Sequence, residues 1–162
     1  MFATPLVADM SGRLTVEMGT DSAKGVTLRR DSQTIAIPPP RHVIWTKMVP
    51  AKSANSVFLL AYEEIGDDTY HWCSLYRVGL PDQTQPLSSN RVTQVLSHAA
   101  MTNMVGDAII AELDGASEDG NRLLLTLAFR EPANDPWATY VRRRPYYLYT
   151  GDATNNLSEI LP

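Results

Sequence analysis

The chain has 162 residues, 44% hydrophobic and 20% charged, which fits a single globular domain (residues 1–162) and excludes a disordered chain. Its formal net charge of −4 excludes the strongly basic surface on which nucleic-acid binding depends. Cys73 is the only cysteine, so the chain has no internal disulfide, and a reducing, cytoplasmic compartment is favoured.

Residues 1–40 alternate between apolar and polar side chains at 14–18, 26–30 and 34–37, a pattern that predicts β-strands. They are interpreted as an N-terminal β-hairpin or a degenerate repeat unit, ended by three successive prolines at 38–40. The first residues lack the basic segment of a signal peptide. No stretch approaches the roughly 20 apolar residues that span a bilayer, so we expect no membrane span.

A first repeat unit is predicted over about residues 41–88. β-Branched and aromatic residues dominate four runs, and Pro, Gly, Asn and Asp separate them. The runs lie at 43–49, 56–64, 69–80 and 85–88. This order predicts a four-stranded antiparallel meander.

The segment 89–105 carries the one predicted helix. Apolar residues recur there at helical spacing, at Val92, Val95, Leu96 and Ala99. Asn90 is the expected N-cap and Gly106 the expected end. The alternative is a strand over 92–96.

A second unit is predicted over about residues 106–161. Its runs lie at 107–113, 122–131, 145–150 and 156–161, and the Asp-Gly signal within 115–121 predicts the first turn. Pro132 to Pro145 is expected to form one long loop, which is the longest insertion that distinguishes this unit from the first. We expect the hairpins 43–49/56–64 and 107–113/122–131 to be antiparallel.

The two units match each other in order and in residue type. Ala61–Glu64 (AYEE) is matched with Ala128–Glu131 (AFRE), and Leu75-Tyr76 with Leu148-Tyr149. The longer loop at 132–145 absorbs the change in spacing, as insertions in repeat proteins do. The sequence therefore predicts an internal repeat, with Leu59, Ala61, Leu125 and Leu127 in the core.

The second unit resembles a blade of a Tol-system type β-propeller. The resemblance is carried by SEDGNRLLLTLAF, with its Asp-Gly entry to an apolar strand, and by YYLYTGDATNNLSEIL, with its Gly-Asp turn. The first unit departs from the pattern, since AKSANSVFLLAY has no Asp-Gly and LPDQTQPLS replaces the Gly-Asp turn. Propellers need four or more blades. The resemblance therefore implies blade-like units that assemble with other chains or pack as a sandwich.

The strongest candidate binding site is an arginine cluster flanked by aromatic residues. Arginine beside aromatic rings suits phosphates, acidic peptides and protein interfaces, because it offers bidentate charge with a stacking face. The predicted binding residues are Trp137, Tyr140, Arg142, Arg143, Arg144 and Tyr146. The alternative is a solvated segment that protects a sheet edge.

Other residues suggest chemistry more weakly. Asp67, Asp68, His71 and Cys73 are close in sequence, but zinc needs further ligands and a free cysteine usually packs as a small hydrophobe. Cys73 with His71 or His98 is the only nucleophile–base pairing, and no catalytic motif accompanies it. Strand-end acids at Glu63, Glu64 and Glu131 could serve a hydrolase only if they converge.

The function predicted from these patterns is a non-catalytic interaction module. It is expected to be a subunit of a larger assembly that binds a protein partner or self-associates through the arginine and aromatic segment. A small-molecule or carbohydrate-binding β domain is the first alternative, with Trp45, Trp72 or Trp137 as a stacking platform. A hydrolase built from scattered acids and histidines is the second. No cofactor and no metal are expected.

Overall fold

The computed structural model describes the backbone over most of the chain: residues 2–6, 14–18, 26–30, 32–37, 43–51, 55–64, 71–81, 85–132, 135, 137–151 and 155–162. Side chains are described from residue 27 onward, except those of 43–45, 63–64 and 71–72 within the strands. All statements below concern these residues.

Three four-stranded antiparallel sheets succeed one another along the chain, and each consists of four consecutive strands in sequence order. The N-terminal sheet contains β1 (Phe2–Leu6), β2 (Leu14–Met18), β3 (Val26–Arg30) and β4 (Gln33–Ala36). The middle sheet contains β5 (Val43–Ala51), β6 (Ser56–Glu64), β7 (His71–Gly79) and β8 (Val92–Leu96). The C-terminal sheet contains β9 (Ala108–Ala116), β10 (Arg122–Arg130), β11 (Tyr140–Tyr149) and β12 (Asn156–Glu159).

The predicted all-β fold with two tandem meanders is therefore confirmed, and so are the two antiparallel hairpins β5–β6 and β9–β10. The expected N-terminal hairpin is present as β3–β4, within a meander of four strands rather than two. β1 went unrecognised in the sequence because Pro5 interrupts it. Proline is tolerated there because β1 is an edge strand.

The end of the first unit differs from the sequence prediction. Residues 85–88 form no strand, and the fourth strand is β8, which follows the short 3-10 helix η2 (Ser89–Arg91). The first unit therefore runs to Leu96 instead of residue 88. The helix predicted within 89–105 is present only over its second half, His98–Val105, and the alternative strand over 92–96 is correct.

A β-bulge explains the helical spacing of Val92, Val95 and Leu96. The register between β7 and β8 shifts between Leu75 and Tyr76. At this point β8 contains one extra residue, which forms the bulge. Val95 and Leu96 are both buried as a result, although they are adjacent in sequence. Two adjacent buried residues after a gap of three imitate the spacing of a helix.

The single α-helix, α1 (His98–Val105), begins after β8 and connects the middle and C-terminal sheets. Ser97 is its N-cap, because its hydroxyl accepts a hydrogen bond from the Ala100 N–H at 3.1 Å. Gly106 ends the helix as expected. Its φ of 92° suits glycine, and its N–H donates to the Thr102 carbonyl.

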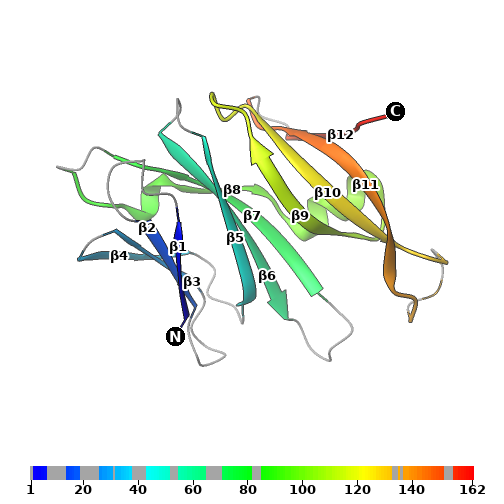
Figure 1. Ribbon diagram of the computed structural model, residues 1–162, viewed down its shortest axis with the longest axis horizontal. Helices are drawn as coiled ribbons and strands as arrows, with labels where there is room; N and C mark the ends of the chain where they lie inside the picture. The colour runs from blue at the N-terminus through cyan, green and yellow to red at the C-terminus, as the bar shows by residue number, and fades with distance from the viewer. Residues whose placement is uncertain are drawn as a thin grey trace.

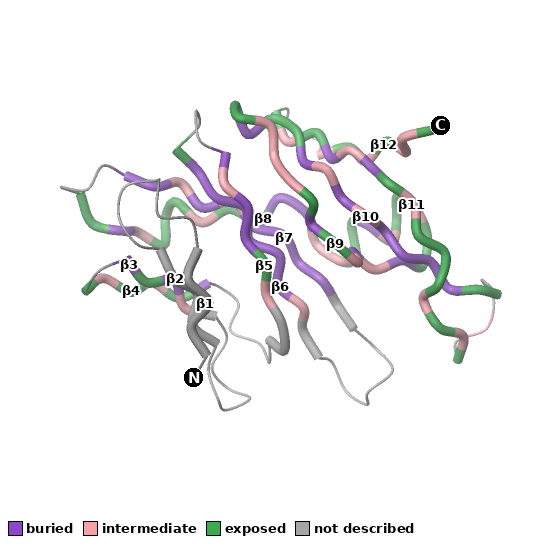
Figure 2. The backbone as a smooth tube through the Cα atoms, viewed as in Figure 1, coloured by how far each residue is buried: buried purple, intermediate pink, exposed green. Residues whose placement is uncertain are grey.

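The sheets are stacked face to face in chain order, from the blue N-terminal sheet to the orange end of the C-terminal sheet (Figure 1). One core cluster joins the N-terminal and middle sheets, through residues such as Leu28, Leu59 and Val78. A larger cluster joins the middle sheet to the C-terminal sheet and includes Met101 of α1. The middle sheet is thus covered on both faces, and most of the described length of β6 and β7 is buried in Figure 2. This explains the unbroken apolar run of β6, whose residues 56–61 are all buried.

Matched residues of the middle and C-terminal sheets face the same way along the stack. β6 and β10 are both nine residues long, so their bounds match Leu59 with Leu125 and Ala61 with Leu127. Leu59 and Ala61 face the N-terminal sheet, and Leu125 and Leu127 face the middle sheet. Matched residues therefore face the preceding sheet in both units. The match of Ala61 with Ala128 made from sequence alone is out of register by one residue.

The opposite faces of β6 and β10 have different surroundings. Phe58 and Leu60 of β6 pack against the C-terminal sheet, whereas their counterparts on β10, Leu124 and Thr126, lie on a face that no described sheet covers. Polar side chains are present on this outer face: the Thr126 hydroxyl donates to Asp114 Oδ2 at 2.8 Å. The outer face therefore ends the stack with a partly polar surface, as terminal units of repeat arrays do.

Candidate functional site: the arginine and aromatic segment of β11

The arginine segment lies on a strand instead of in the predicted loop. β11 begins at Tyr140, five residues before the proline that was taken as its boundary. Pro145 fits inside the strand because its nitrogen faces the side away from β10, where its carbonyl accepts from the Ile160 N–H at 2.9 Å. No hydrogen bond to β10 is lost at this position.

Because side chains alternate along a strand, the three arginines do not form one patch. Arg142 and Arg144 lie opposite Phe129 and Leu127 of β10, on the face that turns toward the middle sheet. Arg143 lies opposite Ala128, on the outer face. The segment therefore presents positive charge on both faces of one strand.

Two of the three arginines form ion pairs with carboxylates of neighbouring strands. Arg143 Nη1 lies 3.4 Å from Glu112 Oε1 of β9, and Arg144 Nη1 lies 2.9 Å from Glu159 Oε1 of β12. Both pairs are largely exposed, so each contributes little to stability. Arg142 is exposed and has its guanidinium carbon 5.3 Å from the centroid of the Phe129 ring, with no carboxylate partner among the described residues.

The aromatic residues of the predicted site divide into core and surface. Tyr146 is buried and packs against Phe129, with ring centroids 6.2 Å apart. Burial raises the pKa of Tyr146, and the negative charge of Glu159 adds to the increase. Tyr146 therefore supports the strand from inside, and it offers no surface to a partner.

Tyr140 belongs to a small polar cluster at the start of β11. Its hydroxyl donates to Asp107 Oδ1 at 2.8 Å, and Arg130 lies over its ring at 4.6 Å. Arg130 Nε forms an ion pair with Asp107 Oδ2 at 2.9 Å. Partial burial raises the pKa of Tyr140, and the hydrogen bond to Asp107 raises it further. These contacts hold the start of β11 in place, next to the exposed residues of that strand.

Trp137 is the most exposed large hydrophobic side chain of the described residues, at 79%. It sits in a tight turn: its N–H donates to Asp135 Oδ1 at 2.9 Å, and the Ala138 N–H donates to the Asp135 carbonyl at 3.1 Å. These bonds hold the backbone at Trp137, whose indole is presented to solvent.

Sequence reasoning missed a second group on the outer face. Arg122 lies over the Tyr147 ring, with its guanidinium carbon 4.6 Å from the ring centroid, and Tyr149 lies beside Tyr147 at 6.3 Å. The signal was present in the alternation of β11, since Tyr147 and Tyr149 share a face with Arg143. The predicted loop over 132–145 separated Arg143 from the predicted strand over 145–150 and so hid the face that they share.

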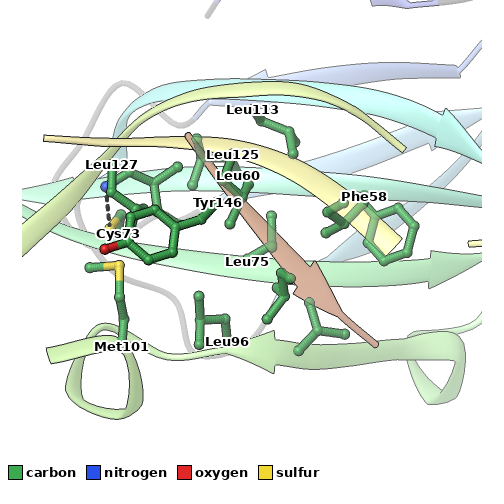
Figure 3. Close-up of a cluster of buried hydrophobic side chains, with 14 of the residues drawn as sticks. Phe58, Leu60, Cys73, Leu75, Leu96, Met101, Leu113, Leu125, Leu127 and Tyr146 are labelled. Carbon is green, nitrogen blue, oxygen red and sulfur yellow. Dashed lines mark hydrogen bonds between the residues drawn. The ribbon is translucent and has the colours of Figure 1, made fainter. Parts of the chain in front are cut away.

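The thiol and histidine weighed as a nucleophile and base come together, but inside the core. Cys73 Sγ lies 3.7 Å from His98 Nδ1 and accepts a hydrogen bond from the Ile110 N–H at 3.4 Å. Cys73 is 1% exposed and lies beside Met101 at one end of the larger core cluster (Figure 3). A substrate cannot reach this thiol without opening the interface between the sheets, so the arrangement acts in packing.

We expect His98 to make stability depend on pH. Burial lowers its pKa from 6.5, although the Asp107 charge acts in the opposite direction. The unfolded chain then binds the proton more readily, so stability falls as the pH drops from 6.5 through the lower folded-state pKa. Denaturant midpoints at about pH 7.5 and about pH 5 should differ more in the wild type than in His98→Gln. Equal differences would exclude this role.

The remaining residues considered from sequence form no site in the described part of the chain. Asp67 and Asp68 lie outside the described residues, as do the side chains of Trp45, Glu63, Glu64, His71 and Trp72. Glu131 is exposed after β10. Among the described residues, no three potential metal ligands gather, and no helix is long and apolar enough to cross a membrane.

Exposed residues at and just before the first half of β11 are Trp137, Val141, Arg142 and Arg143, and they are divided between the two faces of the strand. Comparison of the chain with protein-family models, with curated proteins and with solved structures found no match.

Proposed function

We propose that the protein is a non-catalytic interaction module that binds a protein partner through the first half of β11 and the turn before it. The observation that carries the proposal is the exposure of Trp137 from a hydrogen-bonded turn. Tryptophan and arginine are the residues most enriched among energetic hot spots of interfaces. A tryptophan held in place loses little conformational freedom when it binds.

The distribution of apolar surface supports the same region. The large hydrophobic side chains exposed among the described residues all follow β8, in α1 or in the C-terminal unit. They are Met104, Trp137, Val141, Tyr149 and Leu161. Val141 is 55% exposed and stands next to Arg142, so that apolar and charged contacts alternate near Trp137. That mixture is typical of interfaces that form and dissociate.

Photo-cross-linking tests the proposal. A benzoylphenylalanine at position 137 should give a discrete cross-linked product in an extract of cells that naturally contain the protein. The matched control carries the same group at Glu118, which is exposed in the turn between β9 and β10. An excess of unlabelled wild type should abolish the product, and Trp137→Ala protein should compete poorly. Identical products from both positions, or none from 137, would refute the proposal.

A further inference from the structure

Half of β11 has an open edge. β12 pairs only with Tyr146–Tyr149, and the Ile160 N–H extends this contact to the Pro145 carbonyl. Within the described residues, no strand pairs with the same edge from Tyr140 to Arg144. No backbone hydrogen bond joins residues 161–162 to β11, and Leu161 is 75% exposed.

At this open edge, the backbone N–H and C=O of Arg143 point away from β10. In an antiparallel strand, every second residue directs both its N–H and its C=O to the same neighbour. Pro145 directs its carbonyl toward β12, and the register from Arg142 to Tyr149 is regular. Arg143 therefore presents a donor and an acceptor on the side away from β10.

The corresponding part of the middle sheet has a helix packed beside it. β8 pairs only with Leu75–Val78, so β7 also extends beyond its outer neighbour. Helix α1 packs against this part of β7, with His98 in contact with Cys73. No described element has that position next to β11. The described part of the C-terminal sheet thus lacks such a helix beside this edge.

The charges along the open edge fit an acidic strand. Arg142 and Arg144 project to one face of β11 and Arg143 to the other, and Arg142 has no carboxylate partner in the described residues. The chain already shows the pairing chemistry in Glu159, a carboxylate on the adjacent strand β12 that binds Arg144 at 2.9 Å. A strand placed further along the edge would bring its own carboxylates to Arg142 by the same geometry.

We propose that the edge of β11 from Tyr140 to Arg144 binds an extended acidic peptide segment by strand addition. This inference rests on the proposed function, since the peptide belongs to the protein partner. The N–H and C=O of Arg143 pair with one residue of the peptide, and a glutamate on one face of it contacts Arg142. Main-chain bonds supply affinity, and the arginines supply the preference for acidic sequences.

The probe is a fluorescein-labelled heptapeptide that alternates Glu and Val. The full chain should bind it, with an affinity that falls as salt rises. Arg142→Ala should weaken binding about three- to fivefold, as the loss of one exposed ion pair does. At saturation, hydrogen exchange of the Arg143 amide should slow by at least about tenfold, because it becomes a ladder hydrogen bond. A peptide that alternates Lys and Val should not bind.

A proline separates strand addition from simple charge attraction. Arg143→Ala removes the charge, and Arg143→Pro removes in addition the outward N–H while sparing the bonds to β10. Both variants should retain the wild-type circular dichroism, and the proline variant should bind the heptapeptide several-fold more weakly than the alanine variant. Equal affinities, or an unprotected Arg143 amide, would show that the arginines only guard the edge against pairing. If cross-linking from position 137 then persists, the proposed function stands without strand addition.

Discussion

Leu127→Ala is expected to destabilise the protein by about 2–5 kcal/mol, the range for deleting a buried leucine side chain. Leu127 is fully buried on β10 and faces the middle sheet in the larger core cluster. The cavity would lie between two sheets whose backbones are each tied into a hydrogen-bonded meander, so the surroundings cannot collapse easily into it. Urea or guanidinium unfolding of both proteins measures the difference.

Thr126→Ala is the matched control. Thr126 is the preceding residue on the same strand, but its side chain lies on the outer face and bonds to Asp114 in an exposed position. Its removal should cost about 1 kcal/mol or less. A loss below about 0.5 kcal/mol for Leu127→Ala would mean that the two sheets do not share a core in solution.

Arg30→Met is expected to cost about 2–4 kcal/mol, because it removes charge-assisted hydrogen bonds from a buried site. Arg30 is 2% exposed and extends from β3 into the space between the N-terminal and middle sheets. Its guanidinium donates to the Pro81 carbonyl at 2.8 Å and to the Gln85 carbonyl at 2.6 Å. Methionine replaces the apolar stem of the side chain but leaves these carbonyls without their donor.

Arg29→Met provides the comparison, since Arg29 is the neighbouring residue on β3 and is exposed on the other face. Surface substitutions of this kind usually change stability by less than about 0.5 kcal/mol. In equilibrium unfolding, the free energy of unfolding of Arg30→Met should therefore be well below that of Arg29→Met. Equal losses for the two variants would show that Arg30 does not hold the sheets together.

The strands were predictable where both faces of the chain carry strong apolar or turn signals. β6 and β10 were found almost residue for residue, because long apolar runs bounded by turn residues admit few other structures. β8 was predicted only as the alternative to a helix, because its bulge buries Val95 and Leu96 together. The start of β11 was missed because a proline on an outward-facing edge position costs no hydrogen bond, which the sequence cannot reveal.

The candidate site was only partly predictable for a related reason. Composition drew attention to Arg142, Arg143 and Arg144, but composition does not distribute side chains between two faces of a strand. The separation of Arg143 from its neighbours and the burial of Tyr146 follow from register alone. The open edge depends on where β12 stops, and no local sequence signal gives the length of a pairing between strands.

The burial of the middle sheet on both faces has a consequence for synthesis. Each sheet is made of consecutive strands, so its pairings are local and form early as the chain emerges. The middle sheet is complete at Leu96, yet the residues that cover Phe58 and Leu60 are translated only later, from Met101 to Leu148. During that interval a finished sheet exposes an apolar face to solvent or to a chaperone. We therefore expect chains truncated after α1 to aggregate, although all eight of their strands can pair.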